Sequence, residues 1–319
     1  MKIRLYILAA AAVLGMAACG PRKKAAEPAT RAFPAVEIPM MITEPAERVA
    51  YLALHFWDRF SATDRLFHCD SLTINGVSKE DVEKQMGIFA TMLEQAPAEV
   101  GTSSMQAFYG RLDAFQRAFP GSNMLPEMAA MTQSYFYDPN SPVRSEELYL
   151  PFVQALAASE LIDPTYRTAY DWDARMCALN RRGTPAADFT FIDTAGRKRT
   201  LYGVKARRLL LIFGNPDCGA CRDLMETMEN IPQLQDLLDD GSLKVVDIYI
   251  DEDITLWKSK QDTYPARWIN GYDPSFVIRT DLLYNVRALP SIYLLAEDKT
   301  VLLKDCTPEA ALRALLPGM

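Results

Sequence analysis

Hydrophobic residues recur at helical spacing through the first half of the chain. The clearest stripe has members three or four positions apart: Met105, Phe108, Leu112, Phe115 and Phe119. Three more stripes share this spacing: Val49, Leu52, Phe56 and Phe60; Val82, Met86, Phe89 and Leu93; Leu148, Phe152 and Leu156. Residues so spaced lie on one face of an α-helix, which can then be buried. The pattern therefore predicts an all-α domain over residues 43–182.

Polar residues and prolines indicate where some of these helices begin. Ser78 stands three residues before Asp81, as in a capping box. Asp163 precedes Pro164, which combines an N-cap residue with proline at the first helical position. Pro151 interrupts the last stripe, so we expect it to kink that helix or to shift its start.

The pattern changes after residues 181–185, Arg-Arg-Gly-Thr-Pro, which mark a domain boundary. Residues 188–192 alternate between polar and apolar, which is typical of a strand. Residues 209–213 form a continuous apolar run, as a buried central strand requires. Residues 243–250 predict a further strand.

The last part of the chain predicts a hairpin and then a helix. Residues 291–295 and 300–303 are short strands on either side of a charged turn, and Thr307 with Pro308 opens a helix. The full order is strand, strand, helix, strand, helices, strand, strand, helix. This order predicts an α/β fold with helices around a mixed central sheet over residues 183–319.

The first residues have the pattern of a targeting segment. Lys2 and Arg4 precede an apolar run over residues 7–15 that is too short to cross a bilayer. Residues 1–18 are therefore predicted to be a signal peptide. Met16-Ala17-Ala18-Cys19 resembles a bacterial lipobox, with Met where Leu is usual. The resemblance implies that Cys19 is lipidated; the alternative is an ordinary secretory signal with an incidental cysteine.

The segment after Cys19 is rich in Ala, Pro and basic residues and has no hydrophobic period. Residues 19–42 are therefore predicted to tether the lipid to the first domain. Gly20 follows Cys19, which by resemblance to Gram-negative lipoproteins favours delivery to the outer membrane. We expect the protein in the cell envelope, held to the membrane by its lipid and facing the periplasm.

Composition narrows the choice of partners. The chain has 319 residues, of which 49% are hydrophobic and 24% charged, and its net charge is −7. A folded, mildly acidic protein of this kind has no electrostatic reason to bind nucleic acid. Cys69, Cys177 and Cys306 are isolated in the sequence. Cys69 and Cys177 could form a disulfide within the helical domain, or could be buried free thiols.

The candidate chemistry lies at Cys218-Gly219-Ala220-Cys221. The motif follows the apolar run over residues 209–213 and is predicted to begin a helix. A helix N-terminus favours a thiolate, which is the attacking species in disulfide exchange. Two intervening residues let the second sulfur reach the first and resolve a mixed disulfide. We expect Cys218 to be the exposed nucleophile, Cys221 the buried resolving cysteine, and the Cys218–Cys221 disulfide to be redox-active.

Residues 184–316 resemble the TlpA-like branch of the thioredoxin superfamily. Three segments carry the resemblance: residues 183–189, Gly-Thr-Pro-Ala-Ala-Asp-Phe; residues 215–218, Asn-Pro-Asp-Cys; and residues 288–291, Ala-Leu-Pro-Ser. The helical part resembles the N-terminal domain of lipoproteins of this type from Bacteroidetes, to which no function is attached. The resemblance implies a thioredoxin-like fold and thiol:disulfide oxidoreductase activity, more often as a protein-disulfide reductase, with no cofactor.

The resemblance also implies how substrate and electrons reach the site. Pro290 matches the cis-proline that thioredoxin folds place beside the CxxC motif. It would turn the Leu289 backbone towards an extended substrate chain. The implied substrates are protein or peptide thiols and disulfides, and a membrane protein would donate or accept the electrons.

Two positions depart from the family. Asp217 replaces the usual Trp before the first cysteine; its charge opposes thiolate formation whereas Arg222 favours it, so both are expected to tune the site. The buried acid that relatives carry in the strand beneath the site aligns with Ile212. Three acids are either substitutes for it or ordinary solvated charges: Asp188, Asp223 and Glu226.

A metal site, a structural disulfide and a peroxidase each fit the motif less well. Zinc needs about four ligands, and the two histidines, His55 and His68, lie far off in the helical part. A structural disulfide across so short a loop constrains the unfolded chain little. The peroxiredoxin pattern Pro-x-x-x-Thr-x-x-Cys fails at Leu211 and Asn215.

The alternative function belongs to another class. In it the protein is a redox-inert adaptor that holds a partner through the helical domain.

Overall fold

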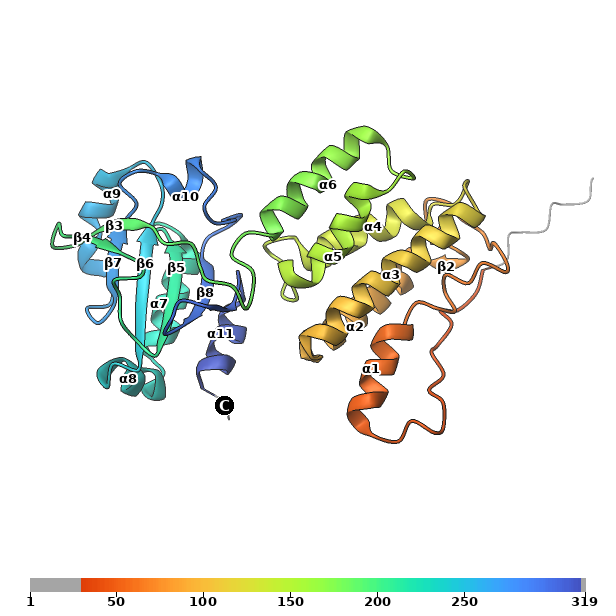
Figure 1. The fold of residues 1–319 in the computed structure, drawn as a ribbon, viewed down its shortest axis with the longest axis horizontal. Helices are drawn as coiled ribbons and strands as arrows, with labels where there is room; N and C mark the ends of the chain where they lie inside the picture. Colours follow the sequence, from red (N-terminus) through yellow and green to blue (C-terminus); the bar gives the residue numbers. More distant parts are fainter. Residues whose placement is uncertain (1–29, 317–319) are drawn as a thin grey trace, which may run out of the picture.

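The structure is a computed structural model that describes residues 30–316. The predicted signal peptide, Cys19 and the first part of the predicted tether lie outside these residues. Within them, a helical region and an α/β region follow one another along the long axis of the molecule (Figure 1). The predicted order, an all-α part before an α/β part, is confirmed. No helix of the described residues is long and apolar enough to span a membrane.

The helical region is made mostly of α-helices. Its elements are α1 Pro45–His55, β1 Thr73–Ile74, β2 Val77–Ser78, α2 Lys79–Gln95, α3 Ala98–Ala118, α4 Met124–Phe136, α5 Glu146–Ala158 and α6 Pro164–Cys177. The sequence did not predict the hairpin of β1 and β2, because strands of two residues are too short to show a period.

The predicted start signals of two helices are confirmed. Ser78 accepts the backbone N–H of Asp81 at 3.1 Å before α2, and Asp163 accepts that of Thr165 at 2.8 Å before α6. These bonds satisfy donors that the first helical turn leaves unpaired. The helix α5 continues through Pro151, so this proline does not set where the helix begins.

An aromatic core holds the helices together. Phe89, Phe108 and Phe152 come from the predicted faces of α2, α3 and α5, and each is at most 1% exposed. The rings of Phe108 and Phe152 stack with 5.4 Å between their centroids. Val49 of α1 is 40% exposed, so the first stripe reaches the core only towards its C-terminal end. Burying a side chain of this size contributes roughly 1.5–3 kcal/mol, so packing accounts for most of the stability of these helices.

The α/β region is built on a mixed sheet. Its elements are β3 Thr190–Asp193, β4 Lys198–Thr200, β5 Arg208–Gly214, α7 Gly219–Glu229, α8 Pro232–Asp239, β6 Leu243–Tyr249, α9 Ile254–Ser259, a 3₁₀ turn Gln261–Thr263, β7 Ile269–Tyr272, α10 Val277–Thr280, β8 Ser291–Ala296, β9 Val301–Leu303 and α11 Pro308–Leu315. The strand order is β4-β3-β7-β6-β5-β8-β9. The strands β5, β6 and β7 run parallel, and the other neighbours are antiparallel. The predicted hairpin of β8 and β9 and the cap of α11 by Thr307 are confirmed.

The strand β7 lies in a segment for which the sequence predicted only helices. Its residues are Ile-Asn-Gly-Tyr, and Asn and Gly are poor strand formers. It forms because β6 and β3 pair with it on both sides. At Gly271 a Cβ would lie 2.6 Å from the Phe191 ring, so the close packing of β7 requires glycine there. Tertiary pairing decides this strand.

Alternation along the strands divides the core of the α/β region into two layers. Leu210, Ile212 and Tyr249 pack with α7, α8 and α9 on one face of the sheet. Leu211 and Phe213 belong to the layer on the other face, together with α10. The central strand β5 is therefore buried on both faces, as its apolar run predicted.

Candidate thiol–disulfide site

The CxxC motif stands where β5 ends and α7 begins. A turn over residues 215–217 joins the two elements, and Cys218 is the N-cap of α7. Its Sγ accepts the backbone N–H of Cys221 at 3.3 Å. The motif thus occupies the predicted strand-to-helix junction, where the N–H groups of the first turn favour negative charge on sulfur.

The two sulfurs have different surroundings. Cys218 is half-buried, whereas Cys221 is only 3% exposed. The Cys218 thiol donates to the carbonyl oxygen of Leu289 at 3.5 Å. Burial raises the pKa of Cys221, and the neighbouring Cys218 thiol adds to the rise. An accessible sulfur beside a buried one with a raised pKa suits the roles of attacking and resolving cysteine.

Leu289 and Pro290 line the site opposite the motif. The peptide bond between them is cis, as the family resemblance implied, and β8 begins at the next residue. The strand β8 pairs antiparallel with β5, with Ser291 opposite Phe213. This register brings the residues before β8 to the end of β5 that carries Cys218.

Polar contacts hold the turn before Cys218. Asn215 donates to Asp251 at 2.6 Å, and Asp251 accepts from Arg279 at 2.6 Å. Arg222 donates to the carbonyl oxygen of Pro216 at 3.1 Å. The turn is therefore tied to the loop after β6, to α10 and to the first turn of α7.

The two charges predicted to tune the thiol lie on either side of it in the chain. Asp217 is exposed, and its carboxylate is 3.8 Å from the ammonium group of Lys260. That cation offsets part of the charge of Asp217. Arg222 donates one guanidinium N–H to the turn, at the carbonyl oxygen of Pro216. The effect of both charges on the thiol stays a prediction.

A buried carboxyl lies beneath the motif, where the sequence did not place one. Asp247 of β6 is 3% exposed and stands opposite Ile212 in the parallel pair of β6 and β5. Strand alternation puts it on the same face as Val245 and Tyr249, which is the face covered by α7. At Gly214, a Cβ would lie 3.0 and 3.1 Å from its two carboxyl oxygens. The carboxyl therefore packs against the last residue of β5.

The surroundings of Asp247 disfavour its charge. Burial raises its pKa to about 7. Within the described residues, its Oδ1 has no hydrogen-bond partner, and neither do the polar side-chain atoms of Trp257, Tyr264 and Trp268 in the same core layer. The Asp247 charge adds to the effect of burial on the pKa of Cys221. A carboxyl that titrates near neutrality beside a resolving thiol can exchange a proton with it.

The three acids considered as substitutes are at the surface. Asp188, Asp223 and Glu226 are all exposed, as solvated charges are. The available signal for Asp247 was a single acid among the apolar residues of 243–250, at an inward position of a predicted strand. Such a residue is seldom buried without a function, because an unpaired buried charge is costly.

The other cysteines of the described residues are free thiols. Cys177 and Cys306 are buried, and Cys69 is half-buried. The disulfide between Cys69 and Cys177 considered from the sequence is not formed in the structure. Burial raises the pKa of Cys177, and it raises that of Cys306 to about 12, so both thiols stay protonated near neutral pH.

The first half of the chain matches a known protein family. Residues 17–177 match the family described as a domain of unknown function, DUF5106, and this match spans half of the 319 residues. The chain belongs to the DUF5106 family. The match ends at the last residue of α6, so the CxxC motif of this DUF5106 protein lies beyond it.

Solved structures show a likeness over both regions. A thioredoxin-like protein from Bacteroides caccae ATCC 43185 is 31% identical with a TM-score of 0.78, and the match covers 91% of this chain and 99% of that one. This likeness confirms the thioredoxin-like fold of the α/β region of the DUF5106 protein.

Two further matches come from Bacteroides fragilis. A conserved protein of unknown function is 37% identical with a TM-score of 0.42, over 42% of this chain and 98% of that one. The C-terminal domain of an uncharacterized protein from strain NCTC 9343 is 40% identical with a TM-score of 0.42, over 43% and 97%. No curated protein matches the chain. A fold of this kind hosts many activities, so the residues of the site decide what the protein can do.

Proposed function

We propose that the protein is a TlpA-like thiol:disulfide oxidoreductase that reduces disulfides in proteins or peptides. The observation that carries the proposal is the geometry of the CxxC motif. A half-buried Cys218 and a buried Cys221 share a helix N-terminus, and the Cys218 thiol meets the backbone beside the cis-proline. A redox-inert adaptor has no use for two free thiols in this arrangement.

Reduction of a substrate proceeds in two exchanges. The Cys218 thiolate attacks a substrate disulfide, which forms a mixed disulfide and releases one substrate thiolate. Cys221 then loses its proton and attacks the Sγ of Cys218. This step releases the second substrate thiolate and leaves the Cys218–Cys221 disulfide. Two electrons from a donor, with two protons, restore the dithiol. Neither exchange uses a cofactor.

Asp247 is the proposed acceptor of the Cys221 proton. A buried thiol with a raised pKa seldom ionises unaided, so the second exchange needs a base. The Asp247 carboxyl has a pKa of about 7 and lies under the same turn. It can therefore take up and return a proton near neutral pH, which a carboxyl with an ordinary pKa does poorly.

The substrate chain is proposed to lie along Leu289 and Pro290. The Leu289 carbonyl oxygen already faces the sulfur that a substrate would be bonded to. An extended chain held by main-chain hydrogen bonds at this point would have its own sulfur next to Cys218. Asp217 and Arg222 complete the proposed site as charges that tune the thiol.

The proposed setting is the cell envelope. It rests on the predicted signal peptide over residues 1–18 and on the lipobox at Cys19. A lipid on Cys19 would hold the protein at the periplasmic face of the outer membrane, with residues 19–42 as its tether. A membrane protein would then supply the electrons that regenerate the dithiol.

The reduction potential of the Cys218–Cys221 pair tests the proposal, measured by equilibration with glutathione or dithiothreitol. A value near about −250 mV or below, close to that of thioredoxin, supports a reductase. A value near about −120 mV would make the protein an oxidant and refute the proposed direction. Cys218→Ser is the matched control and should abolish exchange. If the wild-type pair exchanged with neither reagent, the adaptor function would be favoured instead.

A further inference from the structure

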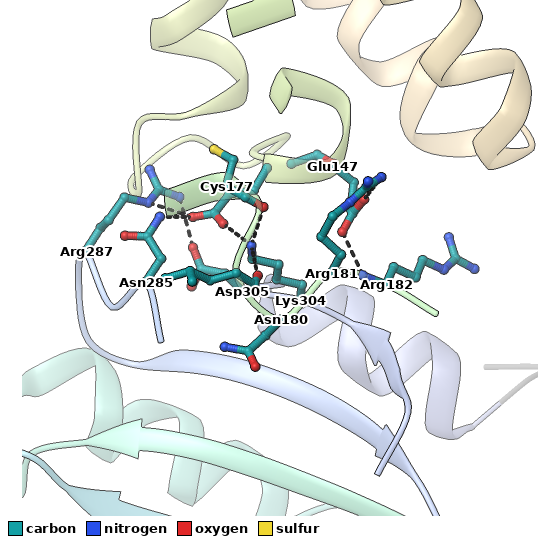
Figure 2. Close-up of polar contacts among 12 residues, drawn as sticks. Glu147, Cys177, Asn180, Arg181, Arg182, Asn285, Arg287, Lys304 and Asp305 are labelled. Carbon is teal, nitrogen blue, oxygen red and sulfur yellow. Dashed lines mark hydrogen bonds and ion pairs between the residues drawn. The ribbon is translucent and has the colours of Figure 1, made fainter. Parts of the chain in front are cut away.

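A buried carboxylate of the helical region meets the α/β region at the contact between them. Glu146, the first residue of α5, is 2% exposed. It accepts from Asn285 at 2.6 Å and from Arg287 at 3.1 Å, and the Lys304 ammonium lies 2.7 Å from its other oxygen. Asn285, Arg287 and Lys304 all belong to the α/β region, and Figure 2 shows them converging on this contact.

Asp305 forms the second half of this cluster. It accepts from Arg287 at 3.0 Å and from the Ser291 hydroxyl at 2.7 Å. Arg144, just before α5, donates to the backbone oxygens of Asp305 and Cys306 at 3.3 and 3.1 Å. Two carboxylates and the Lys304 ammonium are thus buried between the regions, and the partly buried Arg287 and Arg144 lie beside them.

The cluster holds one particular segment, the loop that joins α10 to β8. The helical region contacts this loop at three successive points. Asn180 donates to the Leu283 carbonyl oxygen at 2.8 Å, and Glu146 binds Asn285 and Arg287. The Arg287 guanidinium also lies over the Tyr137 ring, 4.1 Å from its centroid.

This same loop carries the residue that touches the attacking sulfur. Leu289, whose carbonyl oxygen accepts from the Cys218 thiol, is two residues after Arg287 and two before Ser291. Arg287 is held by Glu146 and Asp305, and Ser291 is held by Asp305. The buried cluster therefore fixes the residues on both sides of Leu289, namely Arg287 and Ser291.

Buried charges are not needed simply to hold the two regions together. Burying ion pairs costs desolvation energy that their attraction often only offsets, and apolar residues of the same size hold an interface at least as well. What hydrogen-bonded ion pairs can supply is a defined geometry, because each donor must meet its acceptor at a fixed distance and direction. The position of the cluster, next to the loop at the redox site, indicates where that geometry is used.

From these contacts we infer that Glu146 is a positioning residue for the redox site, so that the helical region is part of the oxidoreductase. Glu146 fixes Asn285 and Arg287, and these fix the backbone of Leu289 and Pro290 against Cys218. The inference rests on the proposed function, because it assigns the helical region a role in docking the substrate chain at that backbone.

Two substrates separate positioning from stability. A peptide disulfide needs the aligned Leu289 backbone, whereas a small aromatic disulfide needs only an accessible Cys218. In Glu146→Gln we expect kcat/KM for the peptide to fall about 2- to 30-fold, the range for changes that act through a packed network. The small disulfide should react at the wild-type rate. The paired variant Glu146→Leu with Lys304→Met removes one charge of each sign and should give the same split if the single variant folds poorly.

Glu94→Gln is the matched control. Glu94 of α2 pairs with Arg313 of α11 at 2.8 Å, so it also joins the two regions, but at the surface and through α11. It should leave both rates unchanged. Equal rates for wild type and both Glu146 variants on the peptide, with only a lower melting temperature, would overturn the inference. The wild-type protein distinguishes failure of this inference from failure of the proposed function. If the proposed function were wrong, the wild type would react with neither disulfide.

Discussion

Replacing Asp247 with Asn should make the protein more stable at high pH and change little at low pH. The folded pKa of about 7 lies above the ordinary 3.8, so the folded state holds a proton that the unfolded state has released. Below about pH 4 the carboxyl is protonated in both states, and burying it costs no ionisation energy. As pH rises from about 4 to about 7, the free energy of unfolding of the wild type falls by about 1.4 kcal/mol for each pH unit. Three units amount to roughly 4 kcal/mol. Asn resembles the protonated acid in size and has no proton to release, so its contribution to the free energy of unfolding does not change with pH.

Urea unfolding of the two reduced proteins at pH 4.5 and pH 8 measures this difference (both values are near the ends of the window set by the two pKa values). At the lower pH, which is less than one unit above the ordinary pKa, the variant should be more stable than the wild type by only about 1 kcal/mol. At the higher pH, Asp247→Asn should be more stable by up to roughly 4 kcal/mol. A difference that is the same at both pH values would refute the idea that a desolvated carboxyl titrates beneath the CxxC motif.

Four further experiments test the site and the elements around it. Cys221→Ser should accumulate a mixed disulfide with a peptide substrate, seen by mass spectrometry, and a single Cys218→Ser change should not. Asp247→Asn should slow the decay of the mixed disulfide in stopped-flow traces by about 10²- to 10⁴-fold, the typical contribution of a general base, and an unchanged rate would exclude Asp247 as the proton acceptor. Gly214→Ala should cost about 1–3 kcal/mol by crowding the Asp247 carboxyl, and less in an Asp247→Ala background, since the two sites are coupled. Thr307→Ala should lower the free energy of unfolding by about 1 kcal/mol through loss of the α11 cap, with no effect on disulfide exchange.

The cysteines of the site could be predicted because their chemistry is local. A CxxC motif after a continuous apolar run sets a strand end, a turn and a helix start within a few residues. The structure has this arrangement, with Cys218 as the N-cap of α7. Helix caps at Ser78, Asp163 and Thr307 were predictable for the same reason, since the donor and acceptor are two or three residues apart.

Asp247 could not be assigned in the same way. The family position for a buried acid aligns with Ile212, and only the register of β5 with β6 shows that Asp247 lies directly beside it. A parallel pairing joins residues far apart in the sequence, here 212 and 247, and no local pattern fixes its register. The acid lies on the neighbouring strand and occupies the same face of the sheet.

The sequence by itself determined the elements whose signals lie within one or two turns: the helical stripes, the caps, the buried strand and the position of the CxxC motif. Tertiary structure alone decided which distant groups meet. Glu146 opens α5 as many acids open a helix, and it becomes a buried ligand of Asn285 and Arg287 only because residues 139 and 141 positions away pack over it. Such contacts depend on how complete elements dock, which the residues near Glu146 in the chain do not encode.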